Sequence, residues 1–216
     1  MIEQLSVSAD THITDPQSAV PNLAFAAGTY DLTQAEFASL CPAYFTQPEG
    51  LRGTAPETPE SIAAFTPETA RSKLAKLPFL AHDLTQHYQG PEMIFRNVDE
   101  GFEIPVDRIV HADGYIGDNQ PSWAGRANDP ASTAKIVGYA KRGKYRESRT
   151  SLRESIDLYT LFTPEGEIFF SATSGNRRVS AAKLRGDQTI SVANIHITRP
   201  EVATLTPDET AELYAS

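Results

Sequence analysis

The sequence predicts an α+β fold, a mixed sheet with flanking helices that is preceded by a mostly helical N-terminal extension. Residues 102–198 alternate between β-branched segments and helical segments, as in a sheet that helices cover. Residues 1–100 carry two helix-start signals and proline-rich stretches instead. The chain has 216 residues, 40% of them hydrophobic, which fits one globular domain with an extension.

The pattern divides the chain into three parts. We expect a helical extension over residues 1–100, an α+β domain over residues 101–200, and a short C-terminal helix within residues 201–216. Residues 1–100 suggest no role.

Two helices of the extension begin at recognisable signals. Thr33 and Glu36 have the spacing of a capping box, so a short helix follows, and Pro42 ends it. Thr66 is followed by proline and glutamate, which starts a second helix that Pro78 ends.

The elements of the α+β domain follow from local patterns and turn residues. A strand is expected first, then a long loop, a basic helix, a hairpin of two strands, a glycine turn, a second helix and a last strand. The expected bounds are a strand at 103–110, a loop at 111–130, a helix at 131–145, strands at 156–162 and 167–172 around Pro164 and Gly166, a helix at 176–185 before Gly186, and a strand at 189–197.

Charge is unevenly distributed along this acidic chain of net charge −9. Residues 1–123 hold 6 Lys/Arg and 17 Asp/Glu, whereas residues 124–185 hold 12 Lys/Arg and 6 Asp/Glu. A basic segment in an acidic chain indicates an anionic ligand for that segment, or a solvated helix that docks on the acidic part. The segment 135–153 is therefore a candidate surface for DNA.

The segment Ser174 to Arg178 is the leading candidate site. A strand that passes through Gly175 into a helix leaves backbone N–H groups unpaired at the helix start, where the helix dipole favours an anion. Arg177 and Arg178 add planar donors suited to phosphate or carboxylate, and Asn176 can donate and accept. The alternative is that both arginines only pair with nearby acids or pack against the core.

The residues from Gly175 to Gly186, followed by the strand that begins at Thr189, resemble the second characteristic box of the ParB/sulfiredoxin-like superfamily. Its members carry Gly-Glu-Arg-Arg or a similar sequence, then an Ala-Ala pair, a glycine and a strand. The preceding hairpin also matches in position. The resemblance is clear over about 156–197 and extends to about 102–198.

The resemblance implies a nucleotide site in which Gly175, Asn176, Arg177 and Arg178 contact phosphates. ParB proteins bind and hydrolyse CTP with magnesium, and relatives include an ATP-dependent reductase, a kinase and nucleases. The chain departs from the family in three respects. Asn176 stands at the place of the ParB glutamate, the box lacks the sulfiredoxin cysteine, and the residues after Ile197 leave no room for the DNA-reading region.

Other residues are weaker candidates. Arg126, five residues after Pro121, is a shifted match to the first ParB box and a possible accessory residue. His111 and Asp113 lie in the long loop that the fold would bring near the site, where they are possible accessory groups, although Asp113 with Gly114 also fits a turn. Trp123 either stacks on a base or anchors that loop. No metal site is expected, because the histidine spacing is wrong and the single Cys41 is best explained as a buried apolar residue.

The leading functional hypothesis is a ParB-like protein that binds a nucleotide, CTP or ATP with magnesium, with NTPase or phosphotransferase activity as an extension. The alternatives are a DNA-binding or accessory module without catalysis, and a ParB-like nuclease. No apolar run approaches the roughly 20 residues that span a bilayer, and the first residues lack the features of a secretory signal. A cytoplasmic protein without membrane contact is expected.

Overall fold

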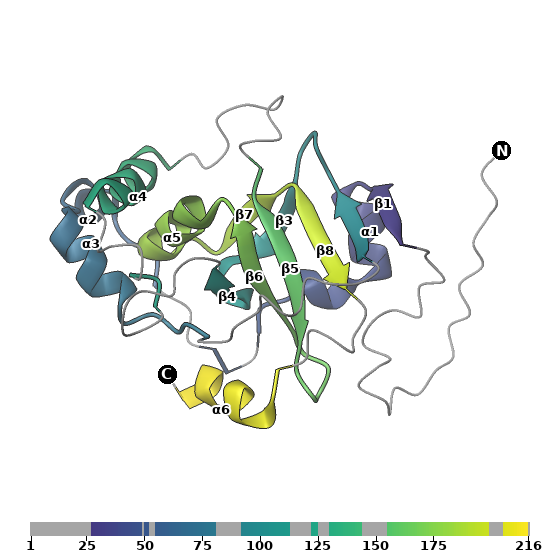
Figure 1. The fold of residues 1–216 in the computed structure, drawn as a ribbon. Coiled ribbons are helices and arrows are strands. Elements are labelled where there is room, and N and C mark those ends of the chain that lie inside the picture. Colours follow the sequence, from purple (N-terminus) through teal and green to yellow (C-terminus); the bar gives the residue numbers. More distant parts are fainter. Residues whose placement is uncertain are drawn as a thin grey trace.

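A computed structural model describes residues 27–48, 50–51, 55–80, 92–112, 122–124, 130–143, 155–198 and 205–215. Its centre is a six-stranded mixed sheet of order β1-β2-β8-β5-β6-β4, accompanied by a two-stranded sheet of β3 and β7 (Figure 1). The strands are β1 Gly28–Asp31, β2 Glu92–Arg96, β3 Phe102–Pro105, β4 Ile109–Ala112, β5 Asp157–Phe162, β6 Ile168–Ser174, β7 Thr189–Val192 and β8 Asn194–Thr198. The predicted mixed α+β class is confirmed.

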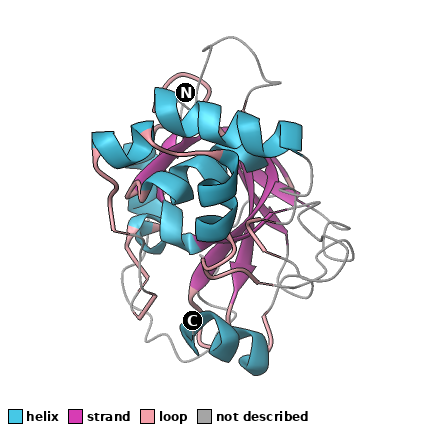
Figure 2. Cartoon of the chain, turned by 90° about the vertical axis from the view of Figure 1, so that its left-hand side faces the viewer, coloured by secondary structure: helices cyan, strands magenta, loops and turns pink. Residues whose placement is uncertain are grey.

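One group of helices lies at the end of the sheets that faces the viewer in Figure 2, and the remaining helices lie elsewhere around the sheets (Figure 1). The α-helices are α1 Gln34–Leu40, α2 Pro59–Ala63, α3 Pro67–Leu74, α4 Pro130–Arg142, α5 Asn176–Arg185 and α6 Pro207–Ala215, and the 3-10 helices are η2 Pro42–Phe45 and η4 Val106–Arg108. Both predicted capping signals are present: the hydroxyls of Thr33 and Thr66 accept from the backbone N–H groups of Glu36 and Thr69.

The hairpin of β5 and β6 forms as the turn residues predict. The two strands are antiparallel, with Phe162 opposite Ile168. The Thr163 hydroxyl accepts from the Glu167 N–H at 3.1 Å, and Gly166 takes a φ of +84° that favours glycine. Local turn chemistry therefore fixes this part of the sheet.

Two of the predicted strands are each divided between the sheets. The strand expected at 103–110 is wrong as one element, because η4 separates β3, which pairs with β7, from β4, which pairs with β6. The strand expected at 189–197 breaks at Ala193, whose N–H donates to the Ile156 carbonyl. Each break carries the chain from the small sheet to the large one.

The sheet continues across residue 100, where the sequence suggested the end of a helical extension. β2 pairs with β1 on one side and with β8 on the other, so residues before 100 supply two strands of the main sheet. Phe37, Tyr44 and Phe95 are fully buried in the main core, and the Phe37 and Phe95 rings stack at 4.8 Å. The described residues before 100 are an integral part of the core.

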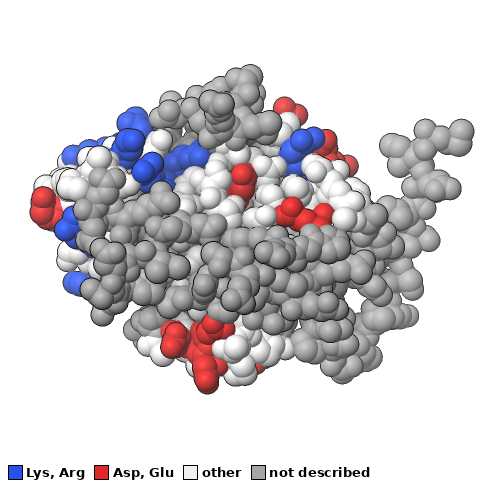
Figure 3. Space-filling model, viewed as in Figure 1, with Lys and Arg blue, Asp and Glu red and all other residues white. Residues whose placement is uncertain are grey.

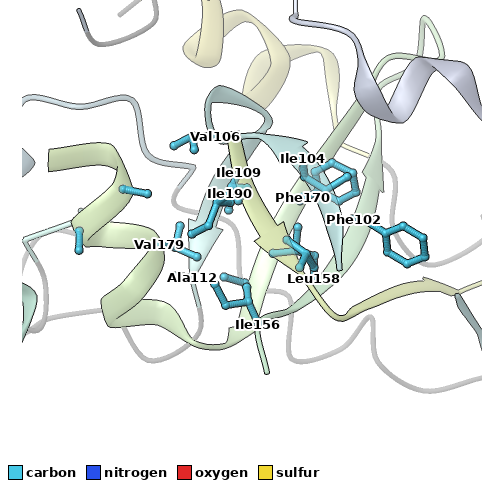
Figure 4. Close-up of a cluster of buried hydrophobic side chains, with 14 of the residues drawn as sticks. Phe102, Ile104, Val106, Ile109, Ala112, Ile156, Leu158, Phe170, Val179 and Ile190 are labelled. Carbon is cyan, nitrogen blue, oxygen red and sulfur yellow. The ribbon is translucent and has the colours of Figure 1, made fainter. Parts of the chain in front are cut away.

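The main core lies between the two sheets and α5. Figure 4 shows Phe102 and Ile104 of β3, Ile190 of β7, Phe170 of β6 and Val179 of α5 in one cluster. A smaller cluster holds α6 against the end of the hairpin and consists of Leu80, Val110, Leu161, Phe169, Leu205 and Leu213. Within the described part of the chain, no helix has the length and apolar character needed to cross a membrane.

Candidate functional site

The candidate site lies at the edge of the large sheet where β4 and β6 end. These strands are parallel neighbours, so their carboxyl ends point to the same edge, and α5 begins directly after β6. β5 is antiparallel to β6 and starts at the same edge, where Asp157 is the register partner of Ser174. Crevices at the carboxyl ends of strands are frequent ligand sites in α/β sheets.

Gly175 makes the turn from β6 into α5. It has a φ of +74°, and a Cβ at this position would lie 2.6 Å from Ile156 Cγ1 and 3.1 Å from Arg178 Nη2. Both the backbone conformation and the close approach of Ile156 therefore require glycine here. As the N-cap of α5, Gly175 offers no side-chain cap to the first turn of the helix.

α4 and α5 run in the same direction, which brings their N-termini together. Arg177 Nε donates to the Ser132 hydroxyl at 2.8 Å, near the start of both helices. Arg185 Nη1 donates to the Ala140 carbonyl at 2.8 Å, near the end of both. Neither helix has an acidic residue in its first turn, so the two positive dipole ends add at one place.

Arg177 and Arg178 have different surroundings. Arg177 is half-buried, and its other guanidinium nitrogens have no partner among the residues that the structure describes. Arg178 is only 8% exposed, and its Nη2 donates to the Ser155 carbonyl at 2.8 Å. The Ser174 hydroxyl donates to that same carbonyl at 3.1 Å, so Ser174 and Arg178 together fix the chain at the entry to β5.

Asn176 is buried at the first position of α5. Its backbone carbonyl accepts from the Ser180 hydroxyl at 3.0 Å, and its side chain is inside the molecule. All five residues of the predicted segment thus gather at one edge, but Arg177 presents a charged group there whereas Arg178 supports the turn from within.

The accessory candidates are placed less favourably. His111 lies on β4 and is buried, with its Nδ1 2.8 Å from the Ser171 hydroxyl and its ring 5.4 Å from the Phe79 ring. Ser171 lies on β6 before the turn, and the described hydrogen bonds of His111 do not reach the segment 174–178. Arg126 and Asp113 lie outside the described residues.

Trp123 anchors its part of the chain to the core. It is fully buried, its Nε1 donates to the Pro78 carbonyl at 2.8 Å, and its ring meets the Phe79 ring edge-on at 5.2 Å. The anchoring interpretation is therefore the one that the structure favours over base stacking.

Lys183 is a buried cation that the sequence patterns did not single out. Its Nζ donates to the Val106 carbonyl at 3.0 Å and lies 4.8 Å from the centre of the Trp123 ring. Burial lowers the pKa of Lys183 to about 8, although the nearby Asp107 carboxylate acts in the opposite direction. No local signal distinguishes this lysine from an exposed one, because its burial depends on η4 and Trp123 packing over α5.

Partners of the site that the sequence did not reveal are Ser132 and Ser155. Both lie far along the chain from the turn and meet it only after folding. The described residues contain no group of three or more His, Cys, Asp or Glu side chains that could hold a metal ion. Comparison of the chain with protein-family models, with curated proteins and with solved structures finds no match.

Proposed function

We propose that this protein binds a nucleotide and holds its phosphates at the edge where α4 and α5 begin. The observation that carries the proposal is the convergence of two helix N-termini, both without acids in the first turn, beside the guanidinium of Arg177. Backbone N–H groups, two aligned dipoles and a planar cation together favour an anion with several oxygens.

The five residues of the segment would take different parts in binding. Gly175 permits the left-handed turn that starts α5, and Arg177 supplies the charged donor, which is already oriented by Ser132. Asn176 offers its backbone N–H at the first position of the helix. Ser174 and Arg178 would act by positioning, because both hold the Ser155 carbonyl.

The resemblance to the ParB/sulfiredoxin-like superfamily supports a nucleotide as the ligand, since the family's phosphate box falls on the same turn. Magnesium fits this proposal as the counter-ion of the phosphates. Asn176 occupies the place of the family's glutamate. We therefore propose that the edge binds a nucleotide. An NTPase or phosphotransferase reaction is a further step, which release of phosphate would reveal.

The test is thermal unfolding with CTP, ATP, ADP and GTP, each with and without magnesium. A ligand that binds the native state at 100 times its dissociation constant stabilises it by about 2.7 kcal/mol, which raises the melting temperature by several degrees. Release of phosphate from the stabilising nucleotide, followed in parallel, reports turnover. No stabilisation by any nucleotide at millimolar concentration would refute the proposal.

A matched pair of variants locates the site. Arg177→Gln removes one charged donor from the edge, and we expect about tenfold weaker binding or more, because charged hydrogen bonds contribute about 1.5–3 kcal/mol. Arg142→Gln makes the same change at the opposite end of α4, where the guanidinium lies over the Tyr139 ring. Equal loss in both variants would mean that bulk charge, not the edge, determines binding.

A further inference from the structure

The exposed side of α3 and α4 carries a group of basic residues that the phosphate edge does not use. They are Arg71 and Lys76, in and just after α3, and Lys135, Lys141 and Arg142 of α4, and all five are exposed. We call these five residues the basic face. α3 packs against α4, and Figure 3 shows Lys and Arg gathered over this end of the molecule.

The part of the basic face that lies on α4 is free of acidic residues. The whole chain has a net charge of −9, yet α4 contains three bases and no acid. Among the acids at this end, Glu57 pairs with Lys73 and Asp187 pairs with Arg185 at 3.1 Å, whereas the exposed Glu68 of α3 lies near Arg71. The acidic residues Asp208, Glu209 and Glu212 lie on α6, away from this end (Figure 3).

The basic face lacks the apolar residues that a protein partner needs. Among the described residues, the large hydrophobic side chains that are exposed are Val98 and Tyr214, and neither is on α3 or α4. Protein interfaces depend on buried aromatic and aliphatic anchors, whereas binding to a polyanion depends on charge and release of counterions. A surface of exposed lysines and arginines without anchors therefore fits a chain of phosphates.

We propose that the basic face binds the phosphate backbone of a nucleic acid, without reading its sequence. Lys135 in the middle of α4 and Arg142 at its end are seven residues apart, about 10 Å along the helix, so both can reach phosphates of one strand. Among the described residues of α3 and α4, no aromatic ring is exposed for bases to stack on, so contact with the backbone alone is expected.

This inference does not rest on the proposed nucleotide site, because it concerns other residues and a polymeric ligand. The two sites are nevertheless neighbours. Ser132, which holds Arg177, precedes Lys135 by about one turn of α4. Because the two sites use different side chains, each can be removed without the other.

The experiment measures anisotropy of a labelled DNA duplex of mixed sequence, titrated with the full chain over a series of salt concentrations. The double variant Lys135→Gln with Lys141→Gln removes two phosphate contacts. The slope of log affinity against log salt should become shallower by about 1.8, at about 0.9 per contact. A second duplex of unrelated sequence should bind equally well.

The matched control is Ala35→Glu with Ser39→Glu, two exposed positions on α1 that change the net charge by the same amount. We expect this control to keep the wild-type slope. No binding at low salt, an unchanged slope in the lysine variant, or an equal effect of the α1 variant would overturn the proposal. Competition by polyglutamate as strong as that by unlabelled DNA would also overturn it, in favour of an acidic protein partner.

The lysine variant also separates this inference from the nucleotide proposal. Its thermal stabilisation by the nucleotide should equal that of the wild type, because Arg177 and the turn are intact. If Arg177→Gln loses nucleotide binding but retains the duplex affinity within a few-fold, both proposals stand independently. Parallel loss of both ligands in the lysine variant would refute a separate basic face.

Discussion

At the scale of single residues, replacing one glycine in the turn and one inside a helix by alanine tests the geometry of the turn. Gly175→Ala should destabilise the protein by about 1–3 kcal/mol, because alanine is strained at a φ of +74° and its Cβ would meet Ile156. Gly138→Ala should stabilise it by about 0.5–1 kcal/mol, since Gly138 lies inside α4 and the nearest atom to the added Cβ is Arg142 Nη1 at 3.6 Å. Urea unfolding of both variants measures the two effects, and the same sign in both would contradict the geometry of the turn.

Lys183 should give the stability a characteristic pH dependence. The pKa of Lys183 is lowered by burial from its usual 10.5 to about 8, so the unfolded chain binds this proton more tightly than the native state. The free energy of unfolding should therefore rise with pH between about 8 and about 10.5, by about 3 kcal/mol. Below pH 8 the cost of burying the ammonium is fully present.

The reference for this measurement is Lys183→Met, which has a side chain of similar shape without a charge. The difference in unfolding free energy between wild type and variant should change across that pH window and be constant at lower pH. Subtracting the variant removes the contribution of other groups, such as Cys41, whose pKa burial raises to about 12. A difference that does not vary with pH would show that Lys183 is not a buried cation.

At the scale of elements, α6 should depend on two leucines. Leu205 and Leu213 are each 2% exposed in the smaller cluster, and the Leu205 N–H donates to the Phe162 carbonyl at 2.7 Å. Leu213→Ala should cost about 2–4 kcal/mol, whereas Glu212→Ala on the exposed side of α6 should cost less than about 0.5 kcal/mol. Hydrogen exchange of the α6 amides, compared between the variants, tests whether the helix undocks.

Elements that depend on neighbouring residues were predictable, and those that depend on distant partners were not. The hairpin around Gly166, the caps at Thr33 and Thr66, and the span of α5 follow from local turn and capping chemistry. The breaks at η4 and Ala193 depend on which sheet each half-strand joins, which no period-two pattern reveals. Likewise, the sequence drew attention to the turn at Gly175, but the parallel packing of α4 beside it rests on Ser132 and Ala140.

At the scale of the whole molecule, charge and core are distributed differently. The basic end formed by α3 and α4 and the acidic α6 lie apart on the surface, so a polyanion would approach the molecule from one side. The core shows no such division, because β1 and β2 continue the sheet that carries the candidate site. The candidate site in the C-terminal half therefore depends on the folding of the N-terminal half.

This connection leads to a prediction about the shortest chain that can fold. Residues 101–216 alone would leave β8 without β2, and the core would lose Phe37, Tyr44 and Phe95. Burying an aromatic side chain of this kind contributes about 1.5–3 kcal/mol, so losing three of them approaches the total stability of a typical domain. The truncated chain should show no cooperative thermal transition and should bind a dye specific for exposed apolar surface. Phe95→Ala in the full chain, expected to cost about 3–5 kcal/mol, checks the same contacts without truncation. A cooperative transition in residues 101–216, with nucleotide binding retained, would instead establish that half as an independent domain, as the sequence pattern alone suggested.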